Sequence, residues 1–529
     1  MIQMECGLQN ARERNLGFFF SGIARNAPDR LALIDLWNSS ERRVTYSQLD
    51  SRANQVAAML AAKGLQPGDR LGLLIGNRIE FIEVFFGSMR AGIVPVPLNI
   101  KQPPAALTFM VEDAGCRGVV VDPDSVSWSD AFLGDLNVSV CVTLGDAGGR
   151  CAAYERALRD AGERFEPSTS PDGVAFQPYT AGLTGRPKGV RLTHEGMLWS
   201  LRTTQDIWPT ATEAVGLVAV PLFHKNAMRG TIKPVLNVGA TAVILPRFEP
   251  RSFLEAVARY RVTFTGGVPA IFTQLLEHRD LLDSLDFSAL EALSIGSAVV
   301  PQELVSNLER SFPRVKVKES YGLTEGGGPL REPVGGGRVP RGSCGVAAPG
   351  YDVALVDGDG HRDVTEGELW TRNPCVTAGY HNLPDVTREK IVDGWLRTGD
   401  VFRKDADGFF YFLGRVDDMF SCGGENIYPR EVENLLLRHP AVRDVSVAPV
   451  PHPVKGFVPA AVVVTTNRSA VTPEDLKAFT LANGPAYAHP RRIILVDELP
   501  LSGAGKPDRA AIRRILEAAF EGPDADGST

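Results

Sequence analysis

The sequence lacks closely spaced cysteine pairs, long apolar runs and an excess of basic residues. Its seven cysteines are scattered and form no CxxC pair, which predicts a reduced, cytoplasmic protein without a structural zinc site. No uninterrupted apolar run approaches the ~18 residues needed to span a bilayer, so we expect no membrane span. The 56 lysines and arginines are outnumbered by 63 acidic residues, which gives a net charge of -7 and argues against nucleic acid as a partner.

Internal repeats and low-complexity tracts are also missing, and the composition is that of a globular protein. Apolar residues make up 44% and charged residues 22% of the 529 residues, which excludes a disordered or fibrous chain. At roughly 100 to 200 residues per domain, the length allows about two to four compact units. The 53 glycines and 37 prolines predict many shaped turns, where enzymes place their ligand contacts.

Helical and strand patterns alternate through the first half of the chain. The predicted helices cover residues 49–63 and 80–91, and the predicted strands cover 70–75, 92–96, 117–121, 174–176, 214–220 and 240–245. Alternation of this kind indicates a mostly parallel sheet with helices on both faces. The sequence therefore predicts an α/β architecture for most of the chain.

The pattern changes after residue 397. A hairpin is predicted from two runs, 401–404 and 409–413, that flank Asp405-Ala406-Asp407-Gly408. The elements expected after it are a helix at 429–438, strands at 442–448, 459–465 and 492–496, and a helix from Pro473. These would form a small α+β domain of about 110 residues. We place the boundary at 414–418, which divides the chain into domains 1–414 and 415–529.

One glycine-rich segment, residues 179–190, reads YTAGLTGRPKGV and follows a predicted strand. Its three glycines, two threonines and lysine can wrap backbone N–H groups and a cation around phosphate oxygens. The segment fails the P-loop pattern GxxxxGK[ST], because Pro187 and Gly189 stand at two of the defining positions. We interpret it as a phosphate-binding loop, with an ordinary surface turn as the alternative.

Three further segments carry chemically useful groups. Residues 319–325, ESYGLTE, place an aromatic face, a hydroxyl and a carboxylate close together, as needed to stack a base, contact phosphate and bind magnesium. Residues 394–400, GWLRTGD, offer an acid suited to ribose hydroxyls, and residues 501–507, LSGAGKP, present one lysine on a turn.

These four segments, in this order, resemble the adenylate-forming superfamily of acyl-CoA synthetases, luciferases and peptide-synthetase adenylation domains. The resemblance covers residues 46 to 513. The segment GRVDDM at 414–419, followed by GGENIYP at 423–429, is most similar to bacterial aryl- and fatty acyl-CoA ligases. The resemblance implies a large N-terminal domain of α/β layers and a smaller, mobile α+β C-terminal domain that carries a catalytic lysine.

The family reaction has two halves, and its substrates and cofactor are ATP, Mg²⁺, coenzyme A and a small carboxylic acid. The carboxylate attacks the α-phosphorus of ATP, and a thiol then displaces AMP from the acyl-adenylate. The protein forms no covalent bond to the substrate, so catalysis depends on positioning and on charge stabilisation. The resemblance implies a carboxylate:CoA ligase.

The resemblance also assigns roles to individual residues. The phosphate contacts would come from Thr180, Gly182, Thr184, Gly185 and Lys188. The adenine site would consist of Tyr321 above Gly296, Ser297 and Ala298, and the ribose would bind Asp400 and Arg415. The catalytic groups would be Lys506, His224, Thr324 and Glu325, with Glu325 and Thr184 at the metal and Asp417 as the hinge between the domains.

The acyl pocket is expected around Asn226, Gly266, Gly267, Gly327 and Gly328. Because four of these residues have no side chain, we expect room for an aryl, phenylpropenoid or medium-chain acid rather than acetate. The alternative is that these glycines serve backbone geometry. Lys225 and Asn226 are candidates to hydrogen-bond a polar group at the far end of the acid.

Two other functions remain open from the sequence. The enzyme could adenylate an acid for a carrier protein or another acceptor, as luciferases do, or the chain could be a catalytically silent adenylate-binding protein. The presence of Lys506, Glu325, Thr324 and Asp400 together argues against silence. The sequence fixes neither the acid nor the oligomeric state.

Overall fold

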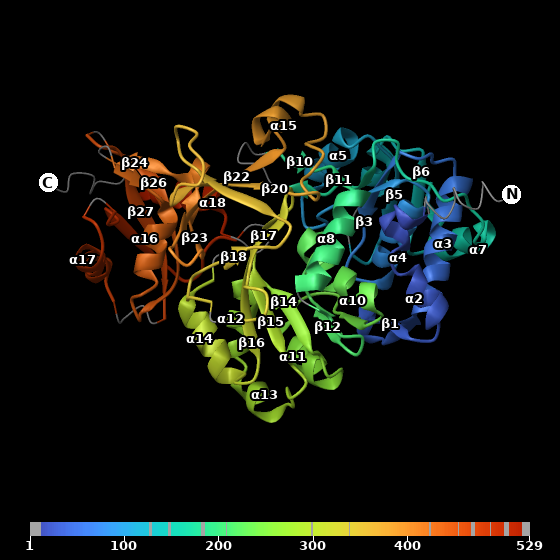
Figure 1. The fold of residues 1–529 in the computed structure, drawn as a ribbon, viewed down its shortest axis with the longest axis horizontal. Coiled ribbons are helices and arrows are strands. Elements are labelled where there is room, and N and C mark those ends of the chain that lie inside the picture. Colours follow the sequence, from blue (N-terminus) through green and yellow to red (C-terminus); the bar gives the residue numbers. More distant parts are fainter. Residues whose placement is uncertain are drawn as a thin grey trace.

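The computed structural model confirms the α/β prediction (Figure 1). The residues it describes are 12–125, 130–146, 150–180, 186–207, 209–297, 300–337, 339–422, 425–452, 454–466, 471–486, 488–501 and 507–520. Several predicted elements match closely: helices α3 (Tyr46–Ala62) and α4 (Ile79–Arg90), and strands β8 (Val174–Phe176) and β28 (Arg492–Val496).

The largest sheet has nine strands within the described residues, in the order β18-β17-β16-β15-β14-β12-β13-β1-β2. Their bounds are β18 Val346–Ala347, β17 Gly327–Arg331, β16 Lys316–Leu323, β15 Ala292–Gly296, β14 Phe264–Gly267, β12 Val215–Val218, β13 Thr241–Ile244, β1 Leu31–Asp35 and β2 Arg42–Thr45. The six strands from β16 to β1 are parallel, and β2, β17 and β18 are antiparallel to their neighbours. Helices α11 (Pro250–Arg259), α12 (Pro269–Leu276) and α14 (Gln302–Ser311) pack their apolar faces on this sheet.

A second sheet, entirely parallel, has the order β4-β3-β5-β6-β7. Its strands are β4 Val94–Pro97, β3 Arg70–Leu74, β5 Cys116–Val121, β6 Val140–Thr143 and β7 Ala152–Ala153. The two prolines of β4 are accommodated because β4 is an edge strand. Helix α3 starts with a capping box between Thr45 and Gln48, and its buried face packs against α4.

A third sheet, β19-β20-β22-β21 with β23 beside β22, follows in the chain. Its strands are β19 Asp352–Val356, β20 Glu366–Arg372, β21 Ile391–Val392, β22 Trp395–Lys404 and β23 Phe410–Arg415. The predicted hairpin is the β22–β23 pair, and Gly408 in its turn has φ of +88°. Glycine adopts this left-handed conformation without the steric cost that a side chain would add.

The C-terminal part has a sheet and a core of its own, drawn in orange and red on one side of Figure 1. The sheet has the order β25-β24-β27-β26, with β28 beside β27. Its other strands are β24 Phe420–Cys422, β25 Glu425–Ile427, β26 Val442–His452 and β27 Gly456–Thr465, and its helices are α16 Pro429–Leu436, α17 Pro473–Asn483 and α18 Arg509–Phe520. The buried residues of this core all lie between 420 and 516.

The prediction that all cysteines are reduced is wrong for one pair. Cys141 and Cys151 form a disulfide, with Cα atoms 4.5 Å apart. They meet because β6 and β7 are parallel neighbours, with Val142 opposite Ala152. The other cysteines that the structure describes are free. No helix among the described residues is long and apolar enough to cross a membrane.

Candidate active site

The carboxyl ends of four parallel strands meet along one edge of the large sheet. His224 follows β12, Val268 follows β14, Ser297 follows β15 and Glu325 follows β16. Open α/β sheets bind ligands at this edge. All four residues line a cleft of about 4310 Å³ that also reaches the C-terminal part of the chain.

The two ends of the predicted phosphate loop form a short hairpin at this cleft. In it, β9 (Tyr179–Thr180) pairs with β10 (Lys188–Gly189), so that Thr180 lies opposite Lys188. The Thr180 hydroxyl donates to Glu325 Oε1 at 3.4 Å. The structure thus brings Thr180 and Lys188 of the first motif beside Glu325 of the second.

Tyr380, which the sequence did not single out, completes this group. Its hydroxyl donates to Glu325 Oε1 at 3.4 Å, and the Lys188 ammonium lies 5.9 Å from the centre of its ring. Burial and the neighbouring Glu325 charge raise the pKa of Tyr380 above its ordinary value. The phenol is therefore a hydrogen-bond donor at neutral pH.

The oxygen atoms around Glu325 fit a magnesium ion. A carboxylate flanked by the Thr180 and Tyr380 hydroxyls is a set of hard oxygen donors, which Mg²⁺ prefers. Mg²⁺ usually takes one or two carboxylates from the protein and its remaining ligands from water and substrate phosphate. Thr184, the second predicted ligand, lies outside the described residues.

Tyr321 and the predicted ribose-binding residues also lie together. The Tyr321 hydroxyl donates to Asp400 Oδ2 at 2.6 Å, and Arg415 Nη1 is 3.6 Å from Asp400 Oδ1. Asp400 and Arg415 are direct cross-strand neighbours on β22 and β23. Burial raises the pKa of Asp400, while Arg415 and the Tyr321 hydroxyl oppose that effect. The edge of the Tyr321 ring contacts Phe402, with centroids 4.9 Å apart.

The predicted floor of the adenine site is built on a close approach of two strands. Gly296 ends β15 opposite Ser320 of β16. A Cβ at position 296 would lie 2.6 Å from Ser320 Oγ and 2.7 Å from its carbonyl oxygen, so no larger residue fits. Ser297 has φ of +62°, a strained conformation for a residue with a side chain, of the kind that clusters at functional sites.

His224 begins the short helix α9 (Lys225–Ala227) at the same cleft. Its ring packs on Phe223, with centroids 4.7 Å apart, and Asn226 is exposed to the cleft. The neighbouring Lys225 ammonium donates to the carbonyl oxygen of Thr324 at 2.5 Å. This hydrogen bond ties α9 to the turn that carries Thr324 and Glu325.

The expectation that glycines widen the acyl pocket is wrong for Gly327 and Gly328. Both are buried, and neither lines the cleft. A Cβ at Gly328 would lie 1.9 Å from Arg229 Nη2, and one at Gly327 would lie 2.5 Å from Cys375 Sγ. Other side chains therefore fill the space, and the φ of +82° at Gly327 favours the backbone-geometry alternative.

Gly266 and Gly267 at the end of β14 do not line the cleft either. A Cβ at Gly266 would lie 3.3 Å from the Ser294 carbonyl, and one at Gly267 would lie 3.2 Å from the Ile271 side chain. These two glycines face the sheet and its covering helix rather than an open pocket.

The predicted hinge lies between the third sheet and the C-terminal sheet. Asp417 is exposed, lines the cleft and belongs to the short 3₁₀ helix η4 (Val416–Asp418). The adjacent Asp418 pairs with Arg509 of α18 at 3.2 Å. The prediction that Asp417 is the pivot stays a prediction.

Five predicted site residues lie outside the described residues: Gly182, Thr184, Gly185, Ala298 and Lys506. Leu501 and Pro507, which flank the lysine motif, form an isolated β-bridge, and both line the cleft.

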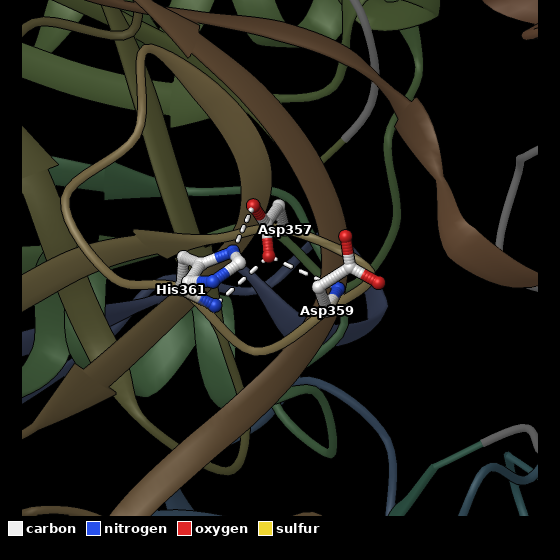
Figure 2. A group of neighbouring side chains, drawn as sticks. All are labelled: Asp357, Asp359 and His361. Carbon is white, nitrogen blue, oxygen red and sulfur yellow. Dashed lines mark hydrogen bonds and ion pairs between the residues drawn. The ribbon is translucent and has the colours of Figure 1, made fainter.

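A separate cluster of Asp357, Asp359 and His361 stands in the loop between β19 and β20 (Figure 2). Asp357 Oδ1 accepts hydrogen bonds from the backbone N–H groups of Asp359 and His361, at 3.0 and 2.8 Å. Asp357 Oδ2 lies 3.0 Å from His361 Nδ1. These contacts stabilise a solvent-exposed turn and account for the arrangement without a bound ion.

Comparison with known proteins identifies two family regions in the chain. The family described as AMP-binding enzyme matches residues 20–381, and the AMP-binding enzyme C-terminal domain matches residues 431–506.

Relatives and a solved structure cover nearly the whole chain. A feruloyl-CoA synthase of an Amycolatopsis species is 33% identical over 510 residues, which is 95% of this chain and 99% of that protein. A long-chain-fatty-acid–CoA ligase of Mycobacterium tuberculosis is 30% identical over 512 residues, covering 96% and 99%. The amide bond synthetase McbA from Marinactinospora thermotolerans has a similar structure, with a TM-score of 0.84 and 25% identity over 96% of this chain and all of McbA.

Proposed function

The chain belongs to the AMP-binding enzymes, and we propose that it joins an aryl, phenylpropenoid or fatty acid to coenzyme A at the expense of ATP. It is an ATP-dependent acyl-CoA synthetase of the AMP-forming kind. One observation carries the assignment of the site: motifs far apart in the chain converge on one cleft. Thr180 contacts Glu325, 145 residues away, and Tyr321 contacts Asp400, 79 residues away.

The first half-reaction is assigned to the phosphate-binding hairpin and the Glu325 turn. Thr180 and Lys188, with the loop between them, bind the β- and γ-phosphates, and Thr324 contacts the α-phosphate. Glu325, with the hydroxyls around it, would hold Mg²⁺, which neutralises phosphate charge when bound. His224 borders the place where the carboxylate attacks. The contact between Thr180 and Glu325 supports this arrangement.

The nucleoside is assigned to the pocket around Tyr321. The ring of Tyr321 stacks on adenine above Gly296 and Ser297, and Asp400 accepts hydrogen bonds from the ribose. Arg415, 3.6 Å from Asp400, favours the ionised form of that carboxylate and orients it. The hydrogen bond from Tyr321 to Asp400 links the adenine and ribose subsites and supports the assignment.

The second half-reaction is assigned to a rearrangement of the C-terminal domain. We take residues 415–529 as this domain, with Asp417 as its pivot and Lys506 as the catalytic lysine of the first half-reaction. The separate core of residues 420–516 supports the boundary. A cytoplasmic location, where ATP and coenzyme A are supplied, is part of the proposal.

The second candidate function is transfer of the acyl group from the adenylate to an acceptor other than coenzyme A. The structural similarity to an amide bond synthetase supports this candidate. The two candidates share the adenylate but differ in what displaces AMP. The test is AMP release from ATP with benzoate, cinnamate and octanoate, in the presence and absence of coenzyme A. The proposal expects release to depend on coenzyme A and a thioester to form. Equal AMP release without it, and no thioester, would favour the other acceptor.

A further inference from the structure

Three basic residues follow one another at intervals of four along one helical stretch beside the active site. Lys225 is in α9, Arg229 is in the π-helical segment η3 (Met228–Ile232), and Lys233 begins α10 (Lys233–Val238). Residues four apart lie on the same side of a helix. A fourth basic residue, Arg331 of β17, comes from the large sheet and is only 3% exposed.

Arg229 is the member of this group that faces both the cleft and the interior. It is half-buried and lines the cleft, and its guanidinium lies beside Gly322 of β16 and Gly328 of β17. Its Nη1 lies 2.9 Å from where a Cβ of Gly322 would be, so the glycines of these strands make room for it. Its Nε is buried and has no hydrogen-bond partner in the structure, and we find no ion pair of Arg229 among the described residues.

Lys233 lies deeper, at 3% exposure. The contact found for its ammonium is the sulfur of Met197, at 3.8 Å, and a thioether is a weak acceptor. Lys225 lines the cleft, and its ammonium donates to the Thr324 carbonyl. The positive charges of this group repel one another, because Lys225 and Arg229 both disfavour the charged form of Lys233.

Anionic groups are scarce around these side chains. The charge of Glu325 favours the protonated form of Lys225. However, Glu325 already accepts hydrogen bonds from Thr180 and Tyr380 at the assigned metal site. The other titratable groups beside the cluster are Cys375 and Tyr351, whose hydroxyl and sulfur lie 3.8 Å apart. Burial raises the pKa of the Tyr351 phenol to about 12, so it is neutral at pH 7.

The lysines can relieve the excess positive charge by losing a proton, since burial lowers the pKa of Lys233 to about 7 and that of Lys225 to about 8. A guanidinium cannot do so, and an enclosed charge is costly unless an anion is bound there. The arginine that lines the cleft offers a planar fork that matches a carboxylate in two hydrogen bonds. The group stands beside His224 and Thr324, in the region assigned to the acyl substrate. A monocarboxylic acid has its one carboxylate at the reacting phosphorus and leaves the arginine without a partner.

We propose that Arg229, with Lys225 beside it, binds a second carboxylate at the far end of the acyl substrate, so that the enzyme activates dicarboxylic acids. This inference rests on the proposed acyl-CoA synthetase function and narrows its substrate class. It also replaces the size argument for the pocket, because Gly328 of β17 makes room for Arg229 rather than for substrate. One carboxylate forms the adenylate, and the other stays ionised against the guanidinium.

The test uses three pairs of acids that differ only in the far carboxylate: benzoate and terephthalate, cinnamate and 4-carboxycinnamate, octanoate and octanedioate. We expect the diacid of at least one pair to exceed its monoacid by about 100-fold or more in kcat/KM for coenzyme A-dependent AMP release. Sites built to pair a polar group reject analogues that lack it by large factors, because the buried partner is left unpaired.

Variants assign the preference to Arg229. Arg229→Met should reduce kcat/KM for the preferred diacid far more than for its monoacid partner and collapse the ratio toward one. Arg229→Lys should retain part of the ratio, since it keeps the charge but loses the fork. Arg314→Met is the matched control, because Arg314 is exposed and does not line the cleft; its ratio should equal that of the wild type.

The outcomes separate this inference from the proposed function. Turnover of the monoacids at equal or higher kcat/KM in all three pairs overturns the dicarboxylate inference and leaves the ligase proposal intact. If no acid is turned over, the dicarboxylate inference is tested by binding instead. Terephthalate, 4-carboxycinnamate and octanedioate are titrated into the wild type and Arg229→Met in a calorimeter. Binding of a diacid that the variant loses supports the inference, and equal or absent binding contradicts it.

Discussion

The hydroxyl of Tyr321 lies 2.6 Å from Oδ2 of Asp400 and joins β16 of the large sheet to β22 of the third sheet. The two residues are 79 positions apart in the chain, and each was assigned separately to the nucleoside. Their contact makes the two proposed subsites, for adenine and for ribose, one unit. Substitutions of Tyr321 that keep the aromatic ring should therefore raise KM for ATP less than those that remove it.

Tyr321→Phe keeps the aromatic face and removes one hydrogen bond to a carboxylate. Such bonds contribute about 1.5 to 3 kcal/mol, so KM for ATP should rise by about 10- to 100-fold, with kcat changed less. Tyr321→Ala also removes the stacking surface and should raise KM for ATP further, by about another tenfold. Steady-state kinetics with varied ATP measures both. Identical KM values for the two variants would show that the ring does not contact adenine.

Lys506→Ala should separate the two half-reactions. Removing one preorganised charge-stabilising donor costs about 100- to 1000-fold, and the family resemblance assigns this lysine to adenylate formation alone. Pyrophosphate exchange should fall by that factor. Thioester formation from a synthetic acyl-adenylate should stay near the wild-type rate, and an equal loss in both assays would remove Lys506 from its assigned role.

Asp417→Pro tests the pivot. Proline fixes φ near roughly -65° and hinges work by changing φ and ψ, so the variant should favour one domain orientation. Either adenylate formation or thioester formation should slow by about tenfold or more, with the other preserved. Single-turnover measurements of each half-reaction distinguish them, and wild-type rates in both would place the hinge elsewhere.

The buried Lys233 predicts how the stability of the protein changes with pH. Burial, with Lys225 and Arg229 nearby, lowers its pKa from 10.5 to about 7. Between these two values the unfolded chain binds the proton more tightly, so this group makes the protein more stable as pH rises from about 7 toward about 10.5. Met cannot titrate, so the gain in unfolding free energy from Lys233→Met should be larger at about pH 7 than at about pH 9.

Urea unfolding of both proteins at the two pH values measures this gain. Lys455→Met, at an exposed position in the turn between β26 and β27, is the control and should show no such trend. A gain from Lys233→Met that is the same at both pH values would mean that Lys233 keeps its ordinary pKa.

Local patterns were sufficient to predict much of the fold and the location of the site. Strands 174–176 and 492–496 were predicted to the residue, because each is a short apolar run bounded by turn residues. The motif containing Thr180 and that containing Glu325 were recognised separately from side-chain chemistry. Neither pattern specifies that the two residues touch, because that contact depends on the order of strands in the sheet.

The errors have a common physical origin. A glycine in the sequence shows that a side chain is missing but not what occupies the space, and Arg229 and Cys375 occupy it at Gly328 and Gly327. The Cys141–Cys151 disulfide likewise depends on two strands being parallel neighbours. The basic cluster beside the cleft, in contrast, is visible in the sequence itself, because Lys225, Arg229 and Lys233 are spaced four residues apart.

The most direct test of the account is the fate of a carboxylate oxygen. If the acid attacks the α-phosphorus of ATP and coenzyme A then displaces AMP, one oxygen of the acid stays on the phosphate of AMP. With an acid labelled with ¹⁸O in its carboxylate, mass spectrometry of the products should show AMP carrying one ¹⁸O together with the acyl-CoA thioester. Unlabelled AMP, or label in inorganic phosphate with ADP as the product, would contradict adenylate formation by this chain.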